Sequence, residues 1–262
     1  MTDRLSARPV ADMMLALGTA QLPHRLAAML RGIAPFTHTV AFGYHQAARP
    51  LALFDDFPAE KWQVFVGEYQ AGPYLLDPFF LASSRPGTAG LFRIKDLAPD
   101  RFYQGEYFRN YYIQTGLAEE IGYFVNLPGG VMVVLSLMRS DRVFTTREFT
   151  ALQAVFPVVD AAIRLQWPSL LQRFSEGSAD ARQPRSDRNL GQAFENFGQS
   201  LLTPREREVV EYTLKGHSGE ATGIIMNIAP GTVRIHRRNI YTKLGISSQG
   251  ELFARFIATL AG

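Results

Sequence analysis

The chain has 262 residues, 47% of them hydrophobic and 19% charged, which is enough for one medium domain and one small domain. It has no cysteine, so disulfides, thiolate catalysis and cysteine-based zinc sites are excluded. The net charge of +3 lies at one end: residues 201–262 carry 8 Lys and Arg against 5 Asp and Glu, whereas the first 200 residues carry 19 of each. This distribution indicates an anionic partner for the C-terminal segment.

Membrane and secretory signals are not evident in the sequence. The N-terminus lacks the continuous apolar run of a secretory signal. The longest apolar stretch, 131–138, is far shorter than the roughly 20 residues that cross a bilayer. We therefore expect a soluble protein that does not bind membranes and that would lie in the cytoplasm of a bacterium.

The first part of the chain alternates helical and strand patterns. In chain order we expect a helix over 10–31 that is broken near Pro23, followed by strands over 37–44 and 51–54 joined by a turn at 47–50. A second helix is expected to begin at Pro58, and a third to span 102–115.

Two further strands, 118–126 and 131–139, flank the turn sequence Pro128-Gly129-Gly130. A long helix then begins at Thr145 or Thr146 and ends near Trp167. The resulting order α-β-β-α-α-β-β-α predicts an α+β domain, built as an α-β-α sandwich around a PAS/GAF-like antiparallel sheet.

The character of the sequence changes after Pro168. Residues 175–188 are polar and aperiodic, which is typical of a linker, although 191–200 could form a short amphipathic helix through Phe194 and Phe197. We divide the chain into a domain over 1–170, a linker over 171–200 and a second domain over 201–262.

The C-terminal segment has the signals of a compact bundle of four helices. Thr203-Pro-Arg-Glu206 is a capping box with Pro at the first helical position, and Gly216 ends the helix that begins there. The remaining helices are expected over 218–227, 230–244 and 249–260. Short helices in this order predict a helix-turn-helix module.

The third of these helices carries positive charge without nearby acids. Residues 221–250 contain no Asp or Glu, and Arg234, Arg238 and Tyr241 share the face opposite the apolar side. A bland interpretation is a solvated basic helix. However, such a face suits a DNA groove, because phosphate neutralisation supplies much of the affinity and Arg can donate a bidentate pair to guanine.

These residues resemble the LuxR-type helix-turn-helix over about 50 positions. The resemblance implies base contacts from Arg234, Ile235 and Arg238, backbone contacts from Thr232, Arg237 and Lys243, and dimerisation through the fourth helix. It implies a homodimer on an inverted repeat of double-stranded DNA, with RNA polymerase as a further candidate partner. The matching residues are Leu202-Thr-Pro-Arg-Glu-Arg-Glu-Val, Gly216-His-Ser, Pro230-Gly-Thr-Val, His236, Tyr241, Lys243-Leu-Gly and Glu251-Leu.

Three positions depart from the family pattern. Thr222 and Gly223 replace the usual Ile-Ala, and Ala229 replaces the usual Ser cap of the recognition helix. Loss of that cap is expected to cost about 1 kcal/mol. Gly within a helix is expected to cost about the same relative to Ala.

The N-terminal domain lacks the acidic pattern of a phosphorylated receiver domain. Instead it resembles the acyl-homoserine-lactone receptors of the same family, with Phe at both pocket Trp positions. Phe65 has no indole N–H to donate to a lactone carbonyl, so we expect another small molecule, with Asp77 pairing an amine or amide. The expected ligand-binding residues are Tyr44, Phe65, Tyr69, Tyr74, Asp77 and Phe92.

Alternatives remain at this point. Asp77-Pro78 is also an ordinary helix start, and the aromatic residues could be core. The domain could then serve only dimerisation or a protein partner, or the chain could be a lactone receptor after all. An enzyme is not expected: the five histidines lack metal-ligand spacing, and we assign no catalytic residue, metal or cofactor.

Overall fold

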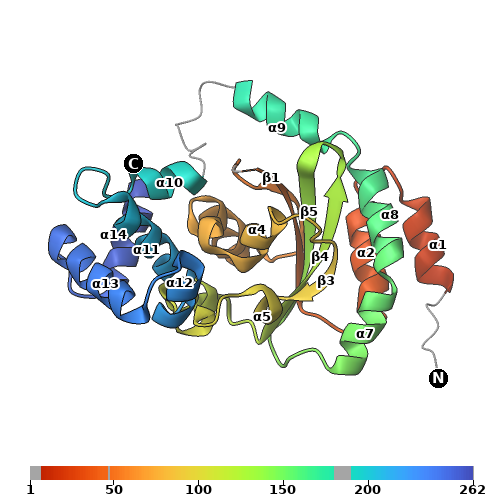
Figure 1. Ribbon diagram of the computed structural model, residues 1–262. Helices are drawn as coiled ribbons and strands as arrows, with labels where there is room; N and C mark the ends of the chain where they lie inside the picture. Colours follow the sequence, from red (N-terminus) through yellow and green to blue (C-terminus); the bar gives the residue numbers. More distant parts are fainter. Residues whose placement is uncertain (1–6, 47, 180–189, 262) are drawn as a thin grey trace.

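The computed structural model describes residues 7–46, 48–179 and 190–261. A five-stranded sheet is covered by helices on both faces, and a lobe of C-terminal helices lies beyond one helical layer (Figure 1). The predicted α-β-α sandwich followed by an all-α module is therefore confirmed.

The sheet is antiparallel throughout, with strand order β2-β1-β5-β4-β3. Side chains alternate between its faces; in β4, Glu120, Gly122 and Phe124 lie on one face and Tyr123 on the other. The short β3 was not predicted. The strands are β1 (His38–His45), β2 (Leu51–Asp55), β3 (Gly90–Arg93), β4 (Glu119–Leu127) and β5 (Val131–Arg139).

The outer face of the sheet is covered mainly by α2 (Leu22–Arg31) and α8 (Phe156–Gln166), as Figure 1 shows. The helix expected after Thr145 is two helices, α7 (Thr146–Ala154) and α8. Pro157 causes the break, because it has no N–H to continue the hydrogen-bond ladder. The helix expected over 10–31 is likewise divided into α1 (Ala7–Leu15) and α2.

Helix α9 (Leu170–Ala179) corrects the prediction of an aperiodic linker over 175–188. The prediction is wrong for residues 175–179, and residues 180–189 lie outside the described residues. Leu170 and Phe174 are buried, and Leu170 lies against Gly43 of β1, so α9 packs on the sheet. Burial of these two apolar side chains stabilises a helix whose other residues are mostly polar.

The inner face carries short helices instead of the single helix expected over 102–115. Gly105 and Tyr111 separate η3, α6 and η4, since both have non-helical backbone angles. The inner elements are α3 (Ala59–Trp62), η1 (Gln63–Glu68), η2 (Pro73–Leu76), α4 (Pro78–Ser83), α5 (Ile94–Leu97), η3 (Phe102–Gln104), α6 (Glu106–Asn110) and η4 (Tyr112–Thr115); η5 (Pro128–Gly130) is the turn between β4 and β5.

The C-terminal module begins as the sequence predicts. The capping box of Thr203 and Glu206 is present, and both Gly216 and Gly245 adopt left-handed angles at helix ends. Short α10 bears Phe194, which stacks on Phe256 of α14 at 4.6 Å. The helices are α10 (Leu190–Asn196), α11 (Pro204–Lys215), α12 (Gly219–Met226), α13 (Pro230–Leu244) and α14 (Gln249–Ala261).

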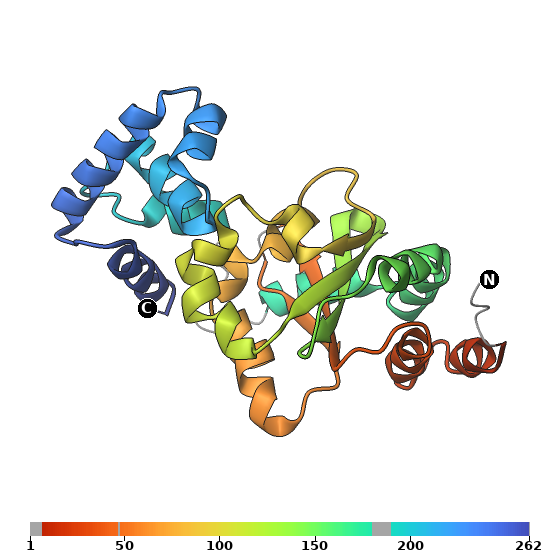
Figure 2. The ribbon, with the colours of Figure 1, turned by 90° about the horizontal axis from the view of Figure 1, so that it is seen from below.

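The C-terminal module rests on the inner helical layer, where α6 contacts α11 and α14 (Figure 2). The amide of Arg101 donates to the carbonyl oxygen of Gly216 at 3.0 Å, and the amide of Ser218 donates to Asp100 Oδ1 at 3.0 Å. A Cβ at Gly216 would lie 3.2 Å from the Phe102 Cα. Buried side chains continue from the inner layer into the module without interruption.

Candidate effector pocket and DNA-binding face

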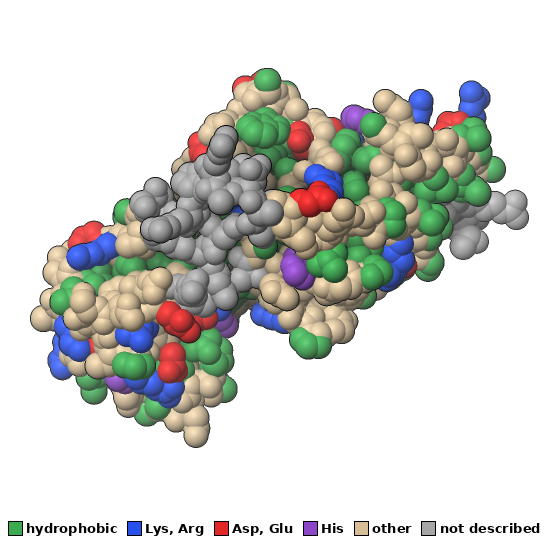
Figure 3. Space-filling view, turned by 90° about the horizontal axis from the view of Figure 1, so that it is seen from above, with side chains coloured by type: hydrophobic (Ala, Val, Ile, Leu, Met, Phe, Trp, Pro, Cys, Tyr) green, Lys and Arg blue, Asp and Glu red, His purple; other side chains and the backbone are tan. Residues whose placement is uncertain are grey.

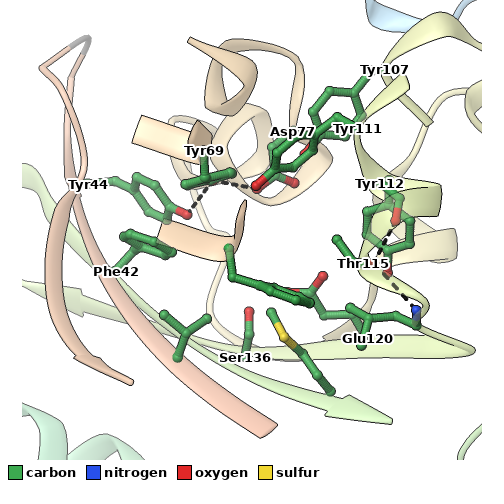
Figure 4. Close-up of a pocket in the computed structure, with 14 residues that line it drawn as sticks. Phe42, Tyr44, Tyr69, Asp77, Tyr107, Tyr111, Tyr112, Thr115, Glu120 and Ser136 are labelled. Carbon is green, nitrogen blue, oxygen red and sulfur yellow. Dashed lines mark hydrogen bonds between the residues drawn. The ribbon is translucent and has the colours of Figure 1, made fainter. Parts of the chain in front are cut away.

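A pocket lies between the sheet and the inner helices. It is a narrow cavity of about 30 Å³, room for only a few atoms, so a larger occupant requires its walls to move; 14 residues line it. Strands β1, β4 and β5 form its floor, and η1, α6 and η4 contribute aromatic walls (Figure 4). Its polar lining includes Asp77, Thr115, Glu120 and Ser136.

Four of the six predicted ligand-binding residues line this pocket: Tyr44, Phe65, Tyr69 and Asp77. The helix that bears Phe65 and Tyr69 contains the π-helical segment η1, a distortion frequent at functional sites.

Tyr74 and Phe92 are not among the described residues that line the pocket. Tyr74 is buried and meets the ring of Phe80 edge-on at 5.0 Å, whereas Phe92 on β3 meets Phe124 edge-on at 5.4 Å. Both therefore pack beside the pocket.

A chain of hydrogen bonds runs along one wall. Tyr69 donates its hydroxyl proton to Asp77 Oδ2 at 2.5 Å, and the hydroxyls of Tyr44 and Tyr69 lie 2.8 Å apart (Figure 4). Because the Tyr69 proton is used on Asp77, Tyr44 must donate to Tyr69. Burial raises the pKa of both tyrosines, and the charge of Asp77 adds to this effect, so both hydroxyls keep their protons.

Asp77 begins a helix, as the alternative interpretation of Asp77-Pro78 predicted, and it also lines the pocket. Its Oδ1 accepts from the amide of Phe79 at 2.9 Å, so Asp77 caps α4 with Pro78 at the first helical position. The same carboxyl is buried at the pocket wall. Burial raises the pKa of Asp77 to about 6, although hydrogen bonds from Tyr69 and Phe79 oppose the shift.

Glu120 is a second carboxyl in the pocket, and the sequence analysis missed it. It lies on the inner face of β4, and burial together with the charge of Asp77 raises its pKa to about 8. The signal was the pair Glu119-Glu120 at the start of an otherwise apolar strand. The burial of Glu119, on the outer face, is explained by its ion pair with Arg93. Within the described residues, no ion pair involves Glu120 or Asp77.

The sequence analysis also missed three pocket tyrosines, Tyr107, Tyr111 and Tyr112. Tyr111 donates its hydroxyl to the carbonyl of Val64 at 2.7 Å. The buried hydroxyl of Tyr112 lies beside Glu120, and its interaction with that carboxyl, like that of Ser136, opposes the rise of the Glu120 pKa.

The predicted DNA-binding residues divide into two groups. Arg234, Ile235 and Arg238 are exposed on α13, with Thr232 half-buried at its N-terminal end. Ile235 is 51% exposed on the same helix. Lys and Arg side chains gather on the C-terminal lobe, seen on the left of Figure 3.

The second group makes contacts within the module. Arg237 donates to Thr213 Oγ1 at 3.1 Å and to the carbonyl of His217 at 3.2 Å. Lys243 pairs with Glu206 at 2.7 Å. A phosphate contact from either cation would compete with, or be shared with, these internal partners.

Helix propensity alone makes Gly223 an unfavourable residue in α12, but the packing around it leaves no room for a side chain. A Cβ at this position would lie 2.7 Å from the carbonyl oxygen of Ile228, so the turn between α12 and α13 requires glycine here. The neighbouring Thr222 hydroxyl is buried and has no hydrogen-bond partner among the described residues. Ala229, as expected, provides no side-chain cap for α13.

Two other kinds of site are not found in the described part of the chain. It contains no cluster of three His, Asp or Glu side chains able to hold a metal ion. None of its helices is both long and apolar enough to span a bilayer.

A sandwich domain with a pocket, joined to a helix-turn-helix module, defines a transcriptional regulator. The chain belongs to the luxR family of bacterial regulatory proteins, whose pattern matches residues 200–256. An HTH-type transcriptional regulator from the exeN 3′ region of Aeromonas salmonicida is 32% identical over 183 residues, covering 69% of this chain and 93% of that protein.

Two further comparisons agree with this family. The transcriptional activator PhzR of Pseudomonas fluorescens is 30% identical over 129 residues, which span 49% of this chain and 45% of PhzR. The LBD domain of VqsR from Pseudomonas aeruginosa superposes with a TM-score of 0.52 at 26% identity, covering 60% of this chain and 93% of that domain. The relatives are regulators of transcription, and the chain is not an enzyme.

Proposed function

We propose that this protein is a dimeric transcription factor that binds an inverted repeat of double-stranded DNA under the control of a small molecule in the pocket. The effector is not a standard acyl-homoserine lactone. The observation that carries this is the chemistry of the pocket wall: Phe65, which stacks on Phe57 at 4.4 Å, offers no hydrogen-bond donor, whereas Asp77 offers an acceptor. A lactone carbonyl left unpaired there would cost on the order of 1–3 kcal/mol.

The DNA-binding part of the proposal rests on the exposed face of α13. Arg234, Ile235 and Arg238 are the residues proposed to contact bases; Thr232, Arg237 and Lys243 are proposed to contact the backbone. Half-sites about one helical turn apart are expected for two such helices related by a twofold axis.

The DNA assignment is tested with the full-length protein. Its preferred sites are selected from a random DNA pool, and the affinity of Arg238→Ala for them is compared with wild type. We expect a loss of about 1–3 kcal/mol and a relaxed preference at one base position. Arg173→Ala, an exposed change on α9, is the matched control. Unchanged affinity and base preference in Arg238→Ala would refute the recognition face.

The effector assignment is tested by thermal denaturation of the full-length protein with acyl-homoserine lactones and with small amines and amides. A ligand at about 100 times its dissociation constant adds about 2.7 kcal/mol of stability. A shift only with non-lactone compounds supports the proposal. A shift of the melting temperature with lactones would identify a lactone receptor. No shift with any compound would favour a domain that serves dimerisation or a protein partner.

A further inference from the structure

Two buried carboxyl groups face one pocket, and this is unusual. Asp77 and Glu120 are 8% exposed each, and both line the cavity. Buried carboxylates in proteins are normally paired with cations or bound to metals, because desolvation of an isolated charge is costly. The ion pairs of the described residues include neither of these two carboxyls. The site therefore has the acceptors for a cation but no cation of its own.

The remaining walls indicate what kind of cation fits. The rings of Phe42, Tyr107 and Tyr111 line the same cavity, and aromatic faces attract organic cations. A metal ion is not indicated, because the described residues contain no group of three His, Asp or Glu side chains that could hold one.

We propose that the effector carries a protonated amine, whose ammonium group lies between the carboxylates of Asp77 and Glu120 within the aromatic walls. This inference rests on the proposed effector-sensing function and names the chemical class of the effector. A neutral amide would pair with Asp77 but would leave Glu120 in its protonated, neutral form. An ammonium group has three donors and a charge, so it satisfies both.

Amine binding should release a proton. In the empty pocket at pH 7, Glu120 holds its proton, because burial and Asp77 raise its pKa to about 8. The other titratable groups facing it are Asp77 and the tyrosines 69, 107, 111 and 112, and each of these tyrosines stays protonated. An adjacent ammonium group favours the carboxylate, so Glu120 ionises as the amine enters.

The test is isothermal titration of the full-length protein with 2-phenylethylamine and hexylamine, each beside its matched alcohol. Titrations at pH 7 are repeated in phosphate and in HEPES, which contains no primary amine and has a different ionisation enthalpy, to count released protons. The variants are Glu120→Gln and Asp77→Asn; Asn also caps helices, so α4 keeps its start. Glu60→Gln, an exposed acid on α3, is the control.

We expect the amines to bind and their alcohols not to bind. Glu120→Gln and Asp77→Asn should each weaken amine binding by at least about tenfold, as loss of one partner of a buried charge pair does, while Glu60→Gln matches wild type. Wild type should release about one proton per amine bound and Glu120→Gln none, a difference that a structural role of Glu120 would not produce.

Three results would overturn the amine inference: alcohols that bind as tightly as amines, amine binding unchanged in Glu120→Gln, or no binding of any amine. In each case the thermal-shift series separates the two proposals. A neutral non-lactone compound that stabilises the protein would leave the proposed sensing function intact. The DNA-affinity measurement does not depend on either result.

Discussion

Among the carboxyl groups of the described residues, Glu120 has the pKa raised furthest above its ordinary value. Its native pKa of about 8 lies above the ordinary value of 4.5, so the native protein holds a proton that the unfolded chain releases. The contribution of Glu120 is therefore most favourable below about pH 4.5 and is lost as the pH rises through about 8. Asp77, raised to about 6, acts in the same direction.

We expect Glu120→Gln to be more stable than wild type at pH 8, with a difference that shrinks towards pH 5. Urea denaturation of both proteins without effector, at intervals from pH 5 to pH 8.5, measures this. The comparison cancels groups common to both, such as His38 and His217, whose pKa values burial lowers. A difference independent of pH would mean that Glu120 is already ionised in the native protein.

The pocket could be predicted only in part, for a physical reason. Tyr69 and Asp77 lie eight residues apart on consecutive short helices, so a local pattern indicates them. Glu120 reaches the same cavity because the inner face of β4 packs against helices distant in the sequence, and the local sequence does not encode that packing. The alternation of β4 identifies two faces, but it cannot assign either one to a pocket.

At the scale of the element, the turn between α12 and α13 depends on the absence of a side chain at Gly223. We expect Gly223→Ala to lower the free energy of unfolding by about 1–3 kcal/mol, because overpacking against the Ile228 carbonyl outweighs the gain in helix propensity. Helical circular dichroism in urea measures it. Thr222→Val, one residue away, is the control: it removes an unpaired buried hydroxyl and should be neutral or stabilising. A stabilised Gly223→Ala would contradict this packing.

Elements were predictable where local signals were strong. The Pro-Gly-Gly turn indicated β4 and β5, the threonine pair at 145–146 indicated the start of α7, and the capping box at Thr203 indicated the start of α11. By contrast, β3 has only four residues, too few to show a period, and exists through its pairing with β4. Helix α9 was missed because most of its residues are polar. The buried side chains of Leu170 and Phe174 hold it on the sheet.

At the scale of the molecule, the docked C-terminal module is the principal feature. Although burial opposes it, hydrogen bonds from Ser218 hold the pKa of Asp100 below its ordinary value. We expect Asp100→Ala to weaken the docking by about 1 kcal/mol, the usual contribution of one such hydrogen bond. Asp96→Ala, an exposed acid nearby, is the control.

The two tryptophans allow this to be measured, since Trp62 and Trp167 both lie outside the C-terminal module. On heating, tryptophan fluorescence follows the sandwich domain, whereas helical circular dichroism follows both parts. The two transitions should coincide in wild type. In Asp100→Ala the circular dichroism signal should begin to fall at a lower temperature than the fluorescence, because the C-terminal module unfolds first. Separate transitions in wild type would show that the two parts unfold independently.

Helix α6 belongs to the pocket and to the docking surface at once. Its Tyr107 is part of the pocket wall, while Glu106 and the preceding Gly105 lie close to Gly250 and Gly216 of the C-terminal module. The five residues of α6 amount to little more than one helical turn. A change that displaces Tyr107 would therefore also disturb Gly105 and Glu106, which lie against the C-terminal module only one or two residues away.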